Sequence, residues 1–205
     1  MRHIYSAIVL LSFSALFSSF SSFANEQMFK TCVACHGNQG EGNEALNSPV
    51  IAGLDKKYLA RQLTMFKSGL RGSHESDTWG QQMRASVSSL SDKDIESLSS
   101  YVSQLTAPKI ISQLSGDAKK GKNIYNGNCG ACHGAKGEGN TTLNAPRLIN
   151  QHDQYLIRQI NHFKSKLRGT SVDDTLGRQM AMMANTVANE KAVIDVITYL
   201  QQANK

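Results

Sequence analysis

The 205-residue sequence lacks several signals that would define other classes of protein. No run of alternating apolar and polar residues predicts a β-strand, and beyond residue 23 no segment is apolar enough to span a bilayer. The formal net charge is +6, but the lysines and arginines are scattered among acids and form no nucleic-acid footprint. Aromatic residues make up only 7% of the chain. We therefore expect an all-α protein with a thin apolar core.

The first 24 residues show the pattern of an export signal. A short basic start precedes an apolar, serine-rich stretch that reaches residue 23 and ends in a small-x-small cleavage pattern at Ala24. These three features are typical of a cleaved secretory signal peptide. An uncleaved membrane anchor needs about 20 apolar residues, whereas serines dilute this stretch. We therefore expect residues 1–24 to be a signal peptide and the mature chain to begin at Asn25.

Cysteine occurs only in two copies of one short motif. The first copy is Cys32-Val33-Ala34-Cys35-His36 and the second is Cys129-Gly130-Ala131-Cys132-His133. A C-x-x-C-H sequence is typical of c-type haem attachment, in which each sulfur forms a thioether with the porphyrin and the following histidine binds the iron. The sequence therefore predicts two covalently bound haem c groups, attached through Cys32, Cys35, Cys129 and Cys132. The predicted proximal iron ligands are His36 and His133.

Three other uses of paired cysteines fit the sequence less well. Zinc ribbons usually separate their pairs by about 15–20 residues, far less than the gap between Cys35 and Cys129. A thioredoxin-like dithiol needs a βαβ context and no trailing histidine. Structural disulfides are compatible with export, but two C-x-x-C loops would be poor long-range crosslinks. We therefore interpret both motifs as haem sites.

The sequence around each motif is repeated in constant register. The paired segments are residues 37–43 and 134–140, 46–49 and 143–146, 58–62 and 155–159, and 66–72 and 163–169. Two copies are too few for a solenoid, so this pattern predicts two similar tandem domains. We place the boundary at Pro108, where a proline follows a helical run. The predicted domains are residues 25–108 and 109–205.

Each domain is predicted to consist of helices joined by loops. In the first, residues 26–35 form a helix running into the haem motif, Asp55 caps a middle helix, and Ser91 begins the last helix in a near capping box. In the second we expect helices over residues 117–128, 153–167 and 189–201. Between the middle and last helix of each domain we expect a loop. A buried porphyrin would supply apolar mass that such small domains lack.

The function depends on what fills the sixth position of each iron. Met83 and Met180 occupy the same repeat position, both in the frame Gly-x-Gln-Met within the predicted loop. A thioether ligand raises the haem potential and closes the iron to small molecules, which favours electron transfer. We therefore predict Met83 and Met180 as the remaining iron ligands. The alternatives are that these methionines fill the core, or that the nearby Met182 is the second ligand.

Prolines and arginines recur around the predicted haem sites. Pro49 and Pro146 follow the two motifs at matching positions. A proline there can hold its carbonyl against the N–H of the proximal imidazole, a contact that tunes the iron; a plain turn is the alternative. Arg71 and Arg168 are candidates for pairing with haem propionates.

Other polar residues carry weaker predictions. Arg61 and Arg158 are also candidates for propionate pairing, with a solvated helix face as the alternative. His74, His152 and His162 have no histidine counterpart in the other copy. We therefore expect all three to be surface or loop histidines.

Both halves together resemble one known family. Tandem C-x-x-C-H motifs, each with a Leu-Asn-x-Pro loop, a Tyr-Leu-x-Arg-Gln helix and a late methionine, resemble the dihaem cytochrome c4 family over nearly the whole mature chain. The resemblance implies two class I cytochrome c domains, related by a pseudo-twofold axis, each wrapped around one covalent haem with histidine and methionine as ligands. The Met-Ala-Met-Met run from Met180 departs from the matched pattern and leaves the identity of that ligand open.

The resemblance further implies an electron-transport protein rather than an enzyme. We expect a periplasmic dihaem cytochrome that carries single electrons between redox proteins of a respiratory chain, towards a terminal oxidase. Its partners would be a respiratory donor and a terminal oxidase or reductase, and the chain would be a monomer. The mild positive charge is compatible with peripheral membrane association. The alternative is a dihaem redox enzyme, of the peroxidase or thiosulfate dehydrogenase type, with one open or labile iron.

Overall fold

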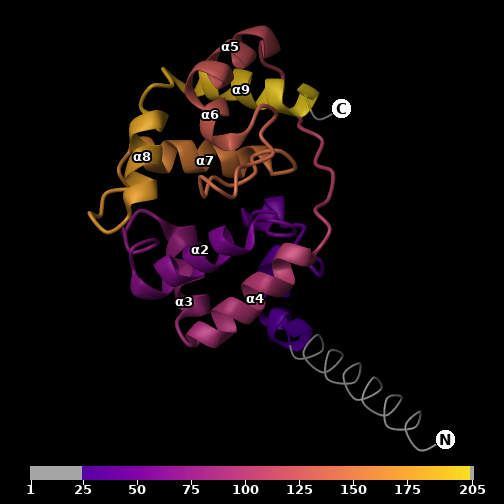
Figure 1. Ribbon diagram of the computed structural model, residues 1–205, viewed down its shortest axis with the longest axis vertical. Helices are drawn as coiled ribbons and strands as arrows, with labels where there is room; N and C mark the ends of the chain where they lie inside the picture. Colours follow the sequence, from indigo (N-terminus) through magenta and orange to yellow (C-terminus); the bar gives the residue numbers. More distant parts are fainter. Residues whose placement is uncertain (1–24, 204–205) are drawn as a thin grey trace, which may run out of the picture.

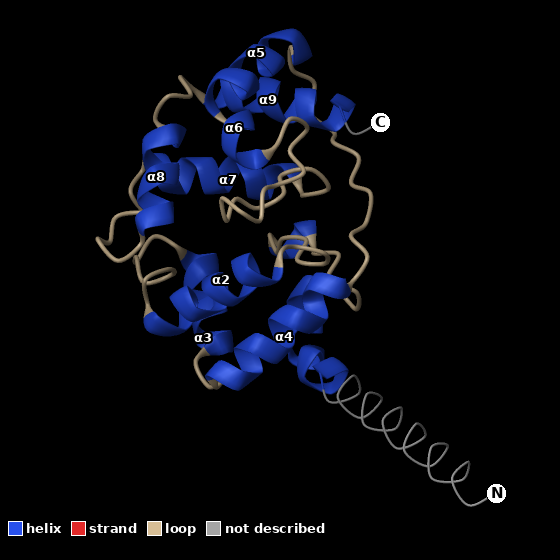
Figure 2. Cartoon of the chain, in the orientation of Figure 1, coloured by secondary structure: helices blue, strands red, loops and turns tan. Residues whose placement is uncertain are grey.

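The computed structural model describes residues 25–203, so the predicted signal peptide lies outside the described residues. Within that range the regular structure is helical and no strand occurs (Figure 2). Two isolated β-bridges, Asn43–Ser48 and Asn140–Ala145, occupy matching positions in the two halves. The all-α fold predicted from the sequence is confirmed.

The first domain begins with a helical segment over residues 25–36. Its other elements are the 3-10 helix η1 Glu44–Leu46 and the helices α2 Lys56–Ser68, α3 Thr78–Val87 and α4 Asp92–Gln104. The Asp55 side chain caps α2, and Ser91 starts α4 with a reciprocal capping box. Such side chains satisfy backbone N–H groups that have no partner inside the helix. Both predicted helix starts are therefore confirmed.

The second domain repeats this order. Its helices are α5 Ala118–Asn128, α6 Gly130–His133, α7 Asp153–Lys164, α8 Thr175–Ala184 and α9 Glu190–Ala203. The helix predicted over residues 153–167 ends earlier, because Lys166 has a positive φ of 63°. Figure 1 shows one domain above the other, joined along one side by residues 106–117, which have no regular structure. The predicted boundary at residue 108 lies in this segment and stays a prediction.

Each domain has a small apolar core. The first core consists of Phe29, Leu54, Leu59, Leu98 and Val102. The second domain has two clusters, which include Ile157 and Tyr125 respectively. Close packing of α5 on α9 requires Gly121, because a Cβ there would collide with the carbonyl of Asp195. No helix in the described part of the chain is long and apolar enough to cross a membrane.

Helices α3 and α8 stand where the sequence predicted loops. Asp77 starts α3 by accepting a hydrogen bond from the backbone N–H of Gly80 at 2.9 Å. Asp174 starts α8 in the same way at 2.8 Å. Each helix buries only one glycine and one aliphatic residue, so it contributes little to the apolar core. The predicted loop is wrong, and Met83 and Met180 both lie on helices.

Candidate haem sites and domain interface

Both predicted proximal histidines are held by a carbonyl from the loop that follows the motif. His36 Nδ1 lies 3.0 Å from the carbonyl oxygen of Pro49. His133 Nδ1 lies 2.8 Å from that of Pro146. Because a carbonyl only accepts hydrogen bonds, Nδ1 carries the proton and Nε2 is unprotonated. The hydrogen bond predicted for both prolines is confirmed, and it leaves Nε2 available to a metal.

The same two histidines are kept neutral by their surroundings. Each is only 8% exposed, and burial lowers the pKa of both rings, with the proline hydrogen bond opposing it. A lowered pKa favours the neutral imidazole, which is the form that binds iron. Position, tautomer and charge therefore all fit a proximal ligand.

The two cysteines of each motif differ in exposure. Cys32 and Cys129 are half-buried, whereas Cys35 and Cys132 are exposed. Burial, reinforced by the neighbouring cysteine, raises the pKa of Cys129 to about 11. Burial likewise raises the pKa of Cys32. Each motif thus presents one sulfur towards the domain interior and one at the surface, which fits two bonds to one porphyrin edge.

A glycine in each loop makes the histidine–proline contact possible. The backbone N–H of Gly42 donates to the carbonyl of His36 at 2.8 Å, and its φ is +79°. A Cβ at Gly42 would lie 2.7 Å from the carbonyl carbon of Pro49. Only glycine fits this conformation and this space. Gly139 has the same hydrogen bond and a φ of +88° in the second domain.

Met83 and Met180 occupy equivalent positions in α3 and α8. Each follows the aspartate that caps its helix at the same interval, and each is half-buried. Met182 is 65% exposed and Met183 is 38% exposed. The side chain of Met182 therefore points away from the interior of its domain. This arrangement favours Met180 over Met182 as the second methionine ligand.

Two buried arginines meet at the domain interface in a pseudo-twofold arrangement. Arg71 donates to Gln62 of its own domain at 2.6 Å and to Gln159 of the other domain at 3.0 Å. Arg168 donates to Gln159 at 2.5 Å and to Gln62 at 3.1 Å. Each arginine is 8% exposed. The reciprocal exchange of partners agrees with the predicted pseudo-twofold relation.

This arginine pair has unused capacity for an anion. Within residues 25–203 neither Arg71 nor Arg168 forms an ion pair, and Arg71 Nε is buried without a hydrogen-bond partner. Burial, helped by repulsion from Arg71, lowers the pKa of Arg168 to about 10. Buried cations are costly unless an anion compensates them. A haem propionate is a carboxylate and would supply the compensating charge and accept hydrogen bonds from a guanidinium, so the residues present fit the predicted cofactor.

Arg61 and Arg158 also cross the domain interface. Arg61 donates to the carbonyl of Asn144 at 3.0 Å. Arg158 donates to the carbonyl of Asn47 at 2.6 Å, and its guanidinium lies 4.7 Å from the centre of the Trp79 ring. A solvated helix face is therefore the wrong alternative for both, because the packing of the domains places each arginine against the opposite loop.

Two of the histidines predicted at the surface or in loops are enclosed between the domains. His162 is 9% exposed, and its Nδ1 lies 3.8 Å from Asp77 Oδ1. His152 Nδ1 lies 3.2 Å from the carboxylate of Glu44, with its side chain 12% exposed. The prediction is wrong for His162, which lies within α7, whereas His152 lies in the loop just before that helix and is half-buried there rather than exposed. In both cases the covering groups come from the other half of the chain. His74 is exposed, as predicted.

Two further interface residues were not predicted from the sequence. The Gln151 side chain accepts from Val50 N at 2.9 Å and donates to Val50 O at 2.8 Å. Arg147 donates to the carbonyl of Ala52 at 3.0 Å. Their repeat counterparts, Leu54 and Val50, are apolar. That replacement of an apolar residue by a polar one was the only available hint.

Comparison with known proteins places these sites in a family context. A sequence model described as Cytochrome c matches residues 24–106 and 118–204. Cytochrome c4 of Azotobacter vinelandii is 29% identical over 180 residues, which cover 83% of this chain and 83% of that protein. A protein named thiosulfate dehydrogenase electron acceptor, from Stutzerimonas stutzeri strain A1501, is 28% identical over 75% of this chain and 72% of its own length.

A solved structure has the same architecture. The crystal structure of reduced recombinant cytochrome c4 from Pseudomonas stutzeri matches with a TM-score of 0.69 and 27% identity. The match covers 88% of this chain and 97% of that chain, so it includes both halves.

Proposed function

The chain belongs to the cytochrome c family, as a dihaem electron-transfer protein of the cytochrome c4 type, and we propose that it carries single electrons between redox proteins of a respiratory chain, towards a terminal oxidase. Its two C-x-x-C-H motifs account for two covalently bound haem c groups. The observation that carries the proposal is that the two sites are built alike, each with a buried histidine hydrogen-bonded to a proline carbonyl and a half-buried methionine at the same helical position.

We assign the attachment sulfurs to Cys32, Cys35, Cys129 and Cys132. We assign the iron ligands to His36 and Met83 in the first domain and to His133 and Met180 in the second. Each domain offers an oriented, neutral imidazole and a half-buried thioether at the same helical position. Two irons closed in this way exchange electrons without binding a substrate.

The bound haem supplies one-electron chemistry, and the protein sets the conditions for it. The proline carbonyls fix the orientation of the proximal rings and increase their basicity. Arg71 and Arg168 are positioned to compensate propionate charge at the interface. The hydrogen bonds across the interface hold one domain against the other, so they would also hold the two haem-binding motifs in a defined relation.

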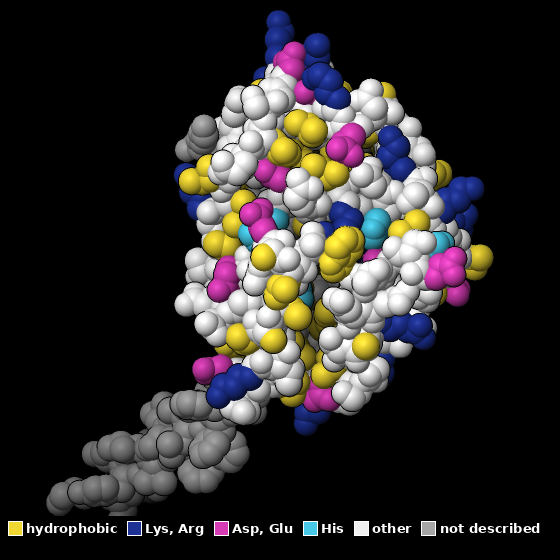
Figure 3. Space-filling view, turned by 180° about the vertical axis from the view of Figure 1, so that it is seen from behind, with side chains coloured by type: hydrophobic (Ala, Val, Ile, Leu, Met, Phe, Trp, Pro, Cys, Tyr) yellow, Lys and Arg dark blue, Asp and Glu magenta, His cyan; other side chains and the backbone are white. Residues whose placement is uncertain are grey.

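The surface is compatible with brief contact with redox proteins. Figure 3 shows apolar side chains in a band along the middle of one face, with Lys and Arg side chains mainly towards its rim. Such a surface suits transient partners, because apolar contact stabilises the complex while charge guides the encounter. The predicted signal peptide supports a location in the periplasm. The surface supports brief contact with a respiratory donor, with an oxidase or reductase, and with the membrane periphery.

An enzymatic role is the competing function. The Stutzerimonas stutzeri strain A1501 relative named for thiosulfate dehydrogenase is named as its electron acceptor, which is a carrier's role. An enzyme of this class needs an iron that is open or weakly ligated. The matched methionine positions in α3 and α8 support two closed irons instead.

An optical spectrum of the purified, oxidised protein tests the proposal. We expect two low-spin haems that show the weak near-infrared band of a methionine–iron bond and do not bind cyanide rapidly, because both axial positions are filled. Haem extraction with acidified acetone should leave the colour with the protein. A high-spin haem that takes up cyanide or peroxide readily would support the enzyme instead.

A further inference from the structure

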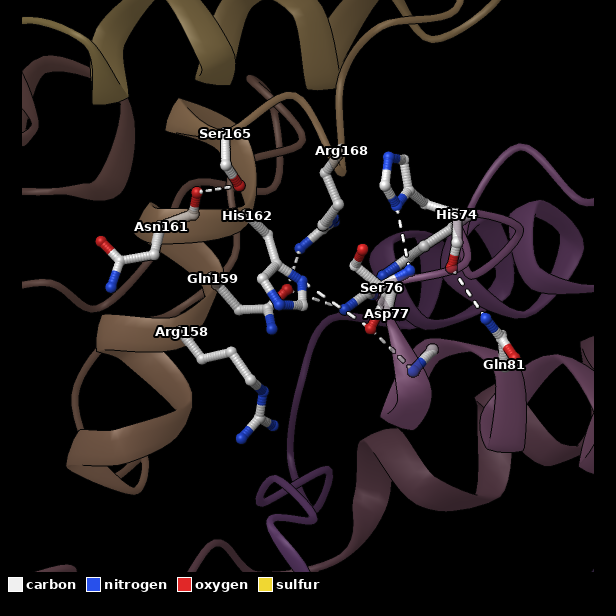
Figure 4. A network of polar contacts seen from close by, with 12 residues as sticks. His74, Ser76, Asp77, Gln81, Arg158, Gln159, Asn161, His162, Ser165 and Arg168 are labelled. Carbon is white, nitrogen blue, oxygen red and sulfur yellow. Dashed lines mark hydrogen bonds and ion pairs between the residues drawn. The ribbon is translucent and has the colours of Figure 1, made fainter.

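One departure from pseudo-twofold symmetry at the domain interface is a buried histidine. His162, on α7, occupies the repeat position of Met65 in the first domain. Figure 4 shows His162 reaching from α7 towards Asp77 at the start of α3. The reciprocal contact would join Met65 to Asp174. The thioether of Met65 binds no proton in the physiological range, whereas the imidazole of His162 does. Of the two reciprocal positions, only His162 can therefore change its charge.

The group that His162 faces also holds a functional helix in place. Asp77 Oδ1 lies 3.8 Å from His162 Nδ1 and accepts the hydrogen bond from Gly80 N that starts α3. That helix carries Met83, the proposed sixth ligand in the first domain. A charge at His162 therefore acts on the N-terminus of the first ligand helix, where charges interact with the helix dipole. For α8 the repeat counterpart of His162 is Met65, which does not titrate.

A second asymmetric contact joins α7 to the same helix. The Arg158 guanidinium lies over the ring of Trp79, whose repeat counterpart is Leu176. The second domain thus contacts α3 and its cap through Arg158 and His162, whereas the repeat counterparts of His162 and Trp79 are Met65 and Leu176. The start of α3 consequently has a titratable neighbour that the repeat does not supply to α8.

We propose that His162, acting through Asp77, is a positioning residue that couples electron uptake at the first haem site to uptake of one proton. This inference rests on the proposed function as a dihaem electron carrier. When the first haem accepts one electron from the redox partner, the unprotonated ring nitrogen of His162 would bind one proton from bulk solvent. Reoxidation returns the electron to the next partner and the proton to solvent. No other bond forms or breaks.

The direction of the coupling follows from charge. Reduction removes one positive charge from the first domain, and a nearby imidazolium is then repelled less. His162 therefore holds its proton more tightly in the reduced protein. By linkage, the potential of the first haem is highest in acid and falls as the pH rises through the titration of His162. The second haem, which lacks this contact, should respond much less.

Several charged groups face His162 and set the range of this titration. Burial lowers the pKa of His162, Asp77 opposes that effect, and Arg158, Arg168 and Arg71 add to the lowering. Asp174 at the start of α8, Tyr58 of α2 and Tyr155 of α7 in turn raise the pKa of Arg168. The pH-dependent range in the oxidised protein should therefore lie below the ordinary histidine value of about 6.5. In the reduced protein His162 should titrate at a higher pH than in the oxidised protein.

Potentiometric titration of the intact dihaem protein at a series of pH values tests this coupling. We expect the first couple to fall by about 30–59 mV across the titration, which is a three- to tenfold change in the ratio of oxidised to reduced haem. The second couple should stay nearly level. Met83→Ala identifies the first couple, because loss of the thioether lowers its potential.

Matched variants separate His162 from other sources of pH dependence. His162→Met, which copies Met65, and His162→Gln should both flatten the profile of the first couple. Asp77→Asn keeps a good helix cap but removes the carboxylate, so it should move the pH-dependent range to lower pH. His74→Gln, at an exposed position, and His152→Gln should leave the profile unchanged.

The outcomes distinguish this inference from the proposed function. A level profile for the first couple, or one that survives both His162 variants or disappears in His152→Gln, overturns the role of His162. Two low-spin, methionine-ligated haems in the same preparation would leave the carrier function intact. A missing methionine–iron band would instead contradict the proposed function itself.

Discussion

At the scale of single residues, one hydrogen bond orients the predicted proximal histidine of each haem site. One proline carbonyl fixes the tautomer of each proximal histidine, and burial keeps the ring neutral. The sequence predicted both contacts because the prolines recur at matching positions. The sequence did not decide whether Met180 or Met182 is the second methionine ligand, because the two are only two residues apart. On a helix, side chains two residues apart point about 200° apart, so only one of them can face the haem.

The methionine assignment predicts different results for two neighbouring substitutions. Met180→Ala should abolish about half of the near-infrared methionine–iron band and open one iron to cyanide. Met182→Ala should change neither, because Met182 is 65% exposed. The near-infrared spectrum of each oxidised variant, with and without cyanide, checks this. Loss of the band in Met182→Ala and its survival in Met180→Ala would reverse the assignment.

At the scale of elements, α3 and α8 share the same start, an aspartate that caps the first turn. Each begins at an aspartate whose carboxylate occupies the space beside a glycine in the first turn, where a Cβ would collide with the carboxylate. The longer helices α2, α4 and α9 were predictable because apolar residues recur along one face. The short ligand helices were not, although their capping aspartates were visible in the sequence.

Removing a cap should loosen the ligand helix that it starts. Asp77→Ala and Asp174→Ala should each destabilise the corresponding domain by about 1 kcal/mol, because an N-cap acceptor is lost. The methionine–iron band should then disappear at a lower urea concentration than in the unmodified protein. Asp77→Asn and Asp174→Asn should retain most of the stability, since asparagine caps equally well. Equal urea midpoints for alanine and asparagine variants would contradict this account.

At the scale of the whole molecule, the interface combines a symmetric and an asymmetric set of contacts. The symmetric set exchanges Arg71 and Arg168 between two glutamines. The asymmetric set comes from the second domain and includes Gln151 and His162. The symmetric contacts come from residues that are the same in both repeats. The asymmetric contacts come from residues that differ between the repeats, so the two domains have different surroundings.

The Gln151 contact should contribute strongly to docking of the domains. Gln151→Ala removes the partner of both backbone groups of Val50, which is fully buried. A buried polar group left without a partner costs about 1–3 kcal/mol. We expect a lower urea midpoint with an unchanged visible spectrum, because both haem sites remain intact. Gln82→Ala, at an exposed position of α3, is the matched control and should have little effect.

The sequence by itself determined what depends on local spacing. Two sulfurs and a histidine must be adjacent to serve one porphyrin, so the attachment motifs, the number of haems and the tandem repeat were all predictable. The capping box at Ser91 and the cap at Asp55 were predictable for the same reason, since each involves neighbours in the chain. The helical character of the segments around Met83 and Met180 was the local feature that the pattern missed.

Only the tertiary structure decided which side chains the two domains share. The partners in such contacts, His162 with Asp77 and Gln151 with Val50, are distant in the sequence, and His162 and Gln151 differ from their repeat counterparts Met65 and Leu54. Their burial and their hydrogen bonds arise when one folded domain packs against the other. A single sequence contains no periodic signal for such a contact, because the partner of a buried polar group is selected by packing rather than by spacing.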